Sequence, residues 1–301
     1  MSVEDPPAAP PPGPRARHYR DKPNPSTADW VRFGLRGTGQ TLITAGLVIL
    51  LFVVYELWIT NIFAHEKQAK AHSQLEKEWA QGKDPLPTDD PRLTLPGGKQ
   101  ATIPIGSGIA NLYIPRLGPD YHFTIVEGTD DGSLEKGPGH YVGTALPGQI
   151  GNFAVAGHRV GKGAPFNDIN LIQSCDAIVV ETQYSWFVYR MVPLAEEKAG
   201  WAQGKGADPK CKGVAPLGGA YAKLDGQQIV PPTNGGVIAP VPPNGGPPPS
   251  KGEMASLMTL TTCHPRFSDK ERLIVHAVLT KQWAKDPKKL NERPPELEET
   301  S

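Results

Sequence analysis

The longest apolar stretch of the chain lies near its N-terminus. From Gly37 to Tyr55 nineteen residues carry no charge, and the apolar pattern continues past Glu56 through LWITNIF. About 20 residues at 1.5 Å each span a hydrocarbon core of about 30 Å. A cleaved signal peptide has a shorter apolar region, of about 7–15 residues, and a small-residue cleavage site. We therefore predict a transmembrane anchor over 37–60, the alternatives being a signal peptide or a buried core helix.

Polar segments flank this stretch on both sides. Segment 1–36 is rich in proline and poor in apolar residues, so we expect a disordered arm. Basic residues are slightly more numerous before the span than after it, which favours a cytoplasmic N-terminus and an external C-terminal domain. Segment 61–100 begins with good helix formers and has a turn signal near Gly82, which predicts a helical stalk followed by a linker.

Across residues 101–281, short apolar runs alternate with turn signals, which is typical of a β domain. Short runs of β-branched and aromatic residues, such as YHFTIVEG and DAIVVETQ, are separated by turn signals, giving at least seven strand candidates. One short helix is possible in FNDINLIQSC. Many short strands favour an antiparallel barrel or a sandwich.

Two further segments depart from this pattern. Segment 200–252 contains NGGVIAPVPPNGGPPPS, and its Gly and Pro density predicts a long surface loop inserted in the domain. Segment 282–301 is charged, and we expect a mobile tail. Glycine and proline number 33 each in 301 residues, an excess that agrees with a globular domain carrying such appendages.

Charge gives little indication of a nucleic-acid partner. The 31 basic and 31 acidic residues balance, and no basic stripe of the kind that binds nucleic acid stands out. No cluster of carboxylates has clear metal-ligand spacing, so we expect neither a metal nor another cofactor.

Three cysteines supply the first candidate chemistry. In an external domain Cys175 and Cys211 could form a disulfide that ties the insert to the body, although the sequence cannot fix the connectivity. Cys263 would then remain free, at the end of the strand candidate ASLMTLTTC. It is either a nucleophile or a small buried thiol.

A cysteine nucleophile needs a base or a cation nearby. His158 follows an apolar strand in NFAVAGHR, at the start of a Gly-rich loop. His264 is a poor candidate, because in a strand its side chain points away from that of Cys263. Arg272 opens the next strand, at the same end of the sheet if the two strands pair, and could stabilise an oxyanion. Arg159 and Arg266 are alternatives to it.

Together these motifs resemble the sortases, and in particular the class E sortases of actinobacteria. The resemblance covers TLTTC with an arginine nine positions on, the upstream GHR, and the segments LYIPRLGPDYHFTIVEG, GPGHYVGTALPGQIGNFAVAGHR and PFNDINLIQSCDAIVVET. It spans about 101–281 apart from the insert, which departs from the pattern where sortases carry a specificity-shaping loop.

The resemblance implies an eight-stranded sortase β-barrel behind a single-pass membrane anchor, with the catalytic domain outside the cell. Cys263 would attack the Thr–Gly bond of a C-terminal LAxTG- or LPxTG-type sorting signal to form a thioacyl intermediate. His158 would be the general acid and then base, and Arg272 would hold the substrate. The protein would then pass to a peptidoglycan amine. Tyr121, Thr261 and Thr262 are candidate substrate contacts, although only one of the two threonines can face the pocket.

Two other readings stay open at this point. A pilin-polymerising sortase would use a lysine of another subunit as acceptor. A non-catalytic binding protein on a sortase scaffold would have no need for cysteine, histidine and arginine together.

Overall fold

The computed structural model describes residues 26–55, 60–86, 103–161, 163–242, 254–286, 289 and 292–300. The chain divides into two compact units with the boundary between Val53 and Val54, and each is described by itself.

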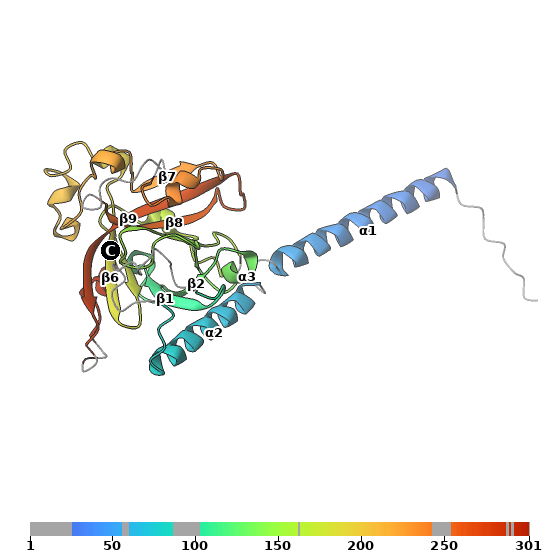
Figure 1. The fold of residues 1–301 in the computed structure, drawn as a ribbon. Helices are drawn as coiled ribbons and strands as arrows, with labels where there is room; N and C mark the ends of the chain where they lie inside the picture. The colour runs from blue at the N-terminus through green and yellow to red at the C-terminus, as the bar shows by residue number, and fades with distance from the viewer. Residues whose placement is uncertain are drawn as a thin grey trace, which may run out of the picture. The chain divides into compact units, whose positions relative to one another are not determined.

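The first unit is the helix α1 (Thr27–Val54) (Figure 1). Of the helices described, it alone is long and apolar enough to cross a membrane, and none of its residues is buried, unlike those of a core helix. It begins at Thr27, so 27–36 are helical where we expected a disordered arm. The cause is an N-terminal cap: Ser26 Oγ accepts from Asp29 N–H at 3.3 Å, and Asp29 Oδ2 accepts from Ser26 N–H at 3.0 Å. Residues 1–25 and 56–59 lie outside the described part.

The second unit is built on one closed β-barrel (Figure 1). Eight strands follow one another in the order β6-β5-β1-β2-β3-β4-β8-β9, and pairing of β6 with β9 closes the ring. The strands are β1 (Gly108–Tyr113), β2 (His122–Glu127), β3 (Gly139–His140), β4 (Gly151–Ala156), β5 (Ala177–Glu181), β6 (Ser185–Met191), β8 (Ser256–His264) and β9 (Glu271–Ala284). This confirms the predicted eight-stranded barrel. It is mixed rather than antiparallel throughout, because β2–β3 and β4–β8 are parallel.

Alternation along the strands separates the barrel interior from its outer face. In β8, Met258 and Leu260 belong to the central core, opposite Ala277 and Val275 of β9. Successive side chains point to opposite faces of a strand. Cys263 therefore lies on the outer face.

Short helices complete the unit. They are α3 (Asp131–Leu134) and the 3-10 turns η2 (Pro115–Leu117), η3 (Ile169–Leu171), η4 (Ala195–Glu197), η5 (Lys205–Ala207), η6 (Pro209–Cys211), η7 (Gly219–Tyr221), η8 (Gly235–Ile238) and η9 (Pro295–Glu298). The short helix expected in FNDINLIQSC is the single turn η3.

The predicted stalk is a helix, α2 (Thr60–Ala80), but it packs on the barrel rather than standing apart from it (Figure 1). Leu75 is 1% exposed. The buried Asn111 of β1 contacts His72 Nδ1 at 3.3 Å through its Oδ1, and Gln68 Nε2 donates to Thr124 O at 3.4 Å. One face of α2 thus packs apolar side chains on the outer face of β1 and β2 and also forms hydrogen bonds with it. The expected linker falls largely on 87–102, outside the described residues.

The Gly/Pro-rich insert is ordered over 200–242. It contributes the edge strand β7 (Gln227–Val230), which pairs with β9 alone, and the turns η5 to η8. Tyr221, Leu224 and Val241 pack on Leu257 of β8. The expected surface loop therefore covers the outer face of β8 and β9. Residues 243–253 lie outside the described part.

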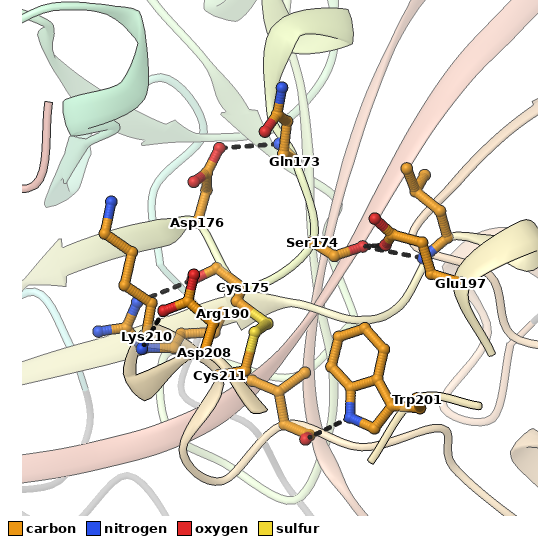
Figure 2. Close-up of a disulfide and its surroundings, with 12 residues drawn as sticks. Gln173, Ser174, Cys175, Asp176, Arg190, Glu197, Trp201, Asp208, Lys210 and Cys211 are labelled. Carbon is orange, nitrogen blue, oxygen red and sulfur yellow. Dashed lines mark hydrogen bonds between the residues drawn. A yellow bond between two sulfur atoms is a disulfide. The ribbon is translucent and has the colours of Figure 1, made fainter. Parts of the chain in front are cut away.

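A disulfide fastens the insert to the body. Cys175 precedes β5, Cys211 ends η6, and the two are bonded with 4.9 Å between their Cα atoms. Figure 2 shows the bond beside Trp201, whose Nε1 donates to Val214 O at 3.2 Å. This is the pairing that the sequence left open.

The tail that we expected to be mobile is partly folded. Residues 292–300, here called the C-terminal strap, contain η9, and Leu297 packs on the apolar cluster around Trp186 and Val188. Arg190 of β6, 4% exposed, donates to both carboxylate oxygens of Glu299 at 2.9 and 2.8 Å. A buried arginine on the outer face of β6 thus receives its counter-ion from the chain end.

A buried polar network joins the insert to the barrel. Thr259 Oγ1 donates to Asn152 Oδ1 at 2.7 Å and lies 2.8 Å from His276 Nδ1, and His276 Nε2 lies 3.0 Å from Gln228 of β7. Asn152 Nδ2 in turn donates to the carbonyl of Val237 in η8 at 3.2 Å. His276 is therefore enclosed on all sides.

Burial lowers the pKa of His276 to about 3, from 6.5. Below pH 6.5 the unfolded chain binds this proton and the folded chain does not. The free energy of unfolding should therefore fall by about 1.4 kcal/mol per pH unit between 6.5 and 3. We expect His276→Gln to flatten the decline of melting temperature between pH 7 and 5, whereas His65→Gln, at an exposed position of α2, should not. Equal slopes in all three proteins would contradict this.

Candidate active site

The sheet register places three candidate residues in one row. Cys263 of β8 pairs directly with Arg272 of β9. On the other side of β8, Ala156 of β4 pairs with Thr261, and Gly157 N–H donates to Thr261 O at 3.0 Å. Continued by two residues, this parallel register brings His158 level with Cys263. Neighbouring strands lie about 4.8 Å apart, and paired residues share a face, so histidine, cysteine and arginine lie side by side.

Gly157 permits the turn that presents His158. A Cβ atom at position 157 would lie 2.5 Å from Cδ2 of Phe166, which packs beneath the loop. The hydroxyl of Thr262 donates to Gly157 O at 2.7 Å and holds this turn against β8. The glycine of the GHR motif is therefore required by packing, in addition to any catalytic role of the histidine.

Cys263 and His158 line the same cavity. It has a volume of about 310 Å³ and is completed by Arg159, Val160, Phe267, Ser268 and Asp269. Cys263 is a free thiol and partly exposed. Phe267 is 79% exposed and has a φ of 63°, in the left-handed region that an aromatic residue seldom adopts. A reagent or substrate can thus reach the sulfur beside an imidazole and an apolar rim.

The two arginines near Cys263 hold different positions. Arg272 Nη1 donates to the carbonyls of Asp269 and Glu271, at 2.8 and 3.0 Å. Arg159 Nη1 instead donates to the carbonyl of Cys263 itself at 3.2 Å. Side-chain rotation about its long stem could turn Arg272 toward a bound substrate, whereas Arg159 is buried in place.

The predicted substrate contacts separate into different environments. Thr261 shares the outer face with Cys263, and its hydroxyl lies 3.0 Å from that of Tyr141. Thr262 points to the other face. Tyr121 donates its hydroxyl to Pro165 O and packs edge-on against Phe123, and burial raises its pKa above the usual range. Of these three residues, none lines the cavity around Cys263.

Sequence reasoning missed the residues of the β8–β9 connection. Phe267, Ser268 and Asp269 form one rim of the cavity. Their only signal was position, since the eight residues between Cys263 and Arg272 must lie at the same end of the sheet as both.

Comparison with known proteins shows the family to which this chain belongs. Residues 112–280 match the model of the sortase domain. Sortase SrtE1 of Streptomyces coelicolor is 35% identical over 247 residues, which are 80% of this chain and 55% of that protein. Sortase SrtE2 of the same organism is 30% identical over 249 residues, 81% of each chain. The SrtF sortase structure from Corynebacterium diphtheriae is 43% identical, with a TM-score of 0.55 over 67% of this chain and 97% of that one.

The chain belongs to the sortase family, and its relatives confirm the resemblance to class E. Sortases are a family of transpeptidases that act on proteins with sorting signals and on cell-wall amines. The chain spans about half the length of SrtE1 and four fifths of SrtE2.

Proposed function

We propose that this chain is a membrane-anchored cysteine transpeptidase that joins secreted proteins to a peptidoglycan amine. The observation that carries the proposal is the row of His158, just beyond the end of β4, with Cys263 of β8 and Arg272 of β9, next to an open cavity. Membership of the sortase family supports the same reaction class.

The first half of the proposed reaction forms a thioester. The Cys263 thiolate attacks the carbonyl carbon between Thr and Gly of the sorting signal. As the carbon–nitrogen bond breaks, His158 gives its proton to the leaving glycine amine. Arg272 turns its guanidinium from the loop carbonyls toward the oxyanion.

The second half transfers the protein to the acceptor. The amine attacks the thioester, the carbon–sulfur bond breaks, and His158 takes the proton from the attacking nitrogen. The products are a new amide and the restored thiolate. A primary amine of a peptidoglycan precursor is the acceptor that we propose.

The proposed function also implies a membrane topology for the chain and a type of sorting signal. We place α1 across the membrane with the N-terminus in the cytoplasm and the barrel outside, where secreted proteins and lipid-linked precursors meet. An LAxTG-type signal is preferred over LPxTG in this proposal. Thr261, on the same face as Cys263, is the best placed of the candidate substrate contacts.

The test uses the full chain in detergent with LAxTG and LPxTG peptides, and peptides with the Thr–Gly order reversed as controls. Without an amine, mass spectrometry should show an acyl adduct on Cys263 with LAxTG, and adding a peptidoglycan stem-peptide amine should convert it to an amide. Conversion only with a lysine-containing pilin peptide would favour the pilin-polymerising alternative. No adduct with any signal would favour the non-catalytic scaffold.

A further inference from the structure

Arg159 is a cation in an unusual position. Arg159 is 7% exposed. Among the described residues, no carboxylate lies within ion-pair distance of its guanidinium. Arg266, the nearby arginine, uses Asp168 as its own partner at 2.5 Å. Burial lowers the pKa of Arg159, the charge of Arg266 adds to this effect, and the carboxylate of Asp168 opposes it. Because a buried cation without a paired anion is costly, its retention needs a reason.

The contacts of Arg159 join the two halves of the proposed site. Nη1 donates to Cys263 O at 3.2 Å and to Nδ1 of His264 at 2.6 Å, and Nη2 donates to Asn170 Oδ1 at 3.3 Å. Arg159 directly follows His158 in the chain. A single planar group thus connects the loop carrying the imidazole with the end of the strand carrying the thiol.

We propose that Arg159 is a positioning residue for the transpeptidation proposed above, fixing the Cys263 segment against the His158 loop and placing a permanent positive charge beside the thiol. The inference rests on the proposed function, but its main test does not need a sorting signal. Arg272, by contrast, is reserved for the substrate.

Two physical effects follow from this placement. The guanidinium spreads its donors over two nitrogens, Nη1 for the Cys263 carbonyl and His264 and Nη2 for Asn170, a geometry that the single nitrogen of a lysine ammonium cannot reproduce. Misplacement of a reacting group by about 1 Å can cost about 100-fold in rate. The charge acts separately, because reactive cysteines lie in electropositive, partly exposed surroundings.

The experiment measures alkylation of Cys263 by iodoacetamide between pH 5 and 10, on the full chain in detergent. Cys175 and Cys211 are bonded to each other, so the reaction reports on Cys263. Arg159→Gln should slow alkylation about tenfold at neutral pH. Arg159→Lys should keep the alkylation rate at neutral pH but lower kcat for amide formation, with KM little changed.

Arg116→Gln is the matched control, since Arg116 contacts Leu171 O and Asp176 away from the cavity. Its alkylation profile should match that of the unchanged protein. An Arg159→Gln profile that also matches would overturn the proposal, whatever happens with peptides. If the glutamine variant has no unfolding transition, Arg159→Lys decides, and unchanged kcat there refutes the positioning role. Failure of every protein to process peptides would instead count against the proposed function.

Discussion

Replacing Cys263 by alanine should lower amide formation by at least about 1,000-fold while leaving the barrel folded. The variant removes the only described free thiol, and the remaining groups can bind the signal but cannot form a thioester. Cys263 is partly exposed at the end of β8, so its sulfur contributes little to the core. We expect the free energy of unfolding to change by less than about 1 kcal/mol.

Mass spectrometry on two variants checks the expected loss of activity. Mass spectrometry with a sorting peptide should show neither adduct nor amide for Cys263→Ala. Cys263→Ser keeps a side chain of similar volume but replaces the thiol by a hydroxyl, a poorer nucleophile. This variant should be nearly as inactive as Cys263→Ala. Amide formation by the alanine variant at the original rate would rule out the thioacyl route.

Removal of residues 292–301 should lower the melting temperature by about 5–10 °C. The truncation takes away the carboxylate of Glu299 from the buried Arg190, and the contact of Leu297 with Trp186 and Val188. Breaking a buried ion pair on one side costs about 3–5 kcal/mol, which we reduce to about 2–3 because Glu299 is 22% exposed. About 1 kcal/mol corresponds to 2–4 °C in a domain of this size.

Point variants separate the ion pair from the rest of the strap. Glu299→Gln should reproduce much of the loss. Glu292→Gln, in an ion pair with Lys289 whose side chains are both more than half exposed, should change the melting temperature by less than about 1 °C. Equal melting temperatures for the truncated and full chains would show that the strap does not stabilise the barrel.

The strap and α2 make stabilising contacts with the barrel from outside the predicted domain limits 101–281. A fragment cut at 101–281 would expose the polar pair Asn111 and Thr124 beneath α2, and would leave Arg190 without Glu299. Both segments are highly charged in sequence, which is typical of a stalk or a tail. Their few apolar contacts, Leu75 and Leu297, are too sparse to predict docking.

The alternation of the strand candidates, the Gly/Pro-rich insert and the apolar span were readable from the chain because they depend on local periodicity and composition. The order of the strands was not, since parallel pairing of β4 with β8 joins segments about a hundred residues apart. Strands that follow one another in the chain often pair, but their pattern does not show which distant apolar strand will be a neighbour.

The same division holds for the site. By itself the sequence determined the apolar span, the strand-rich domain and, through the resemblance of its motifs, Cys263, His158 and Arg272 as candidates. Only the tertiary structure decided that these three lie in one row, that the insert and strap cover the barrel, and that Arg159 reaches the Cys263 carbonyl. Motifs are local in the chain, whereas a row across three strands and a buried guanidinium exist only after distant segments pack together.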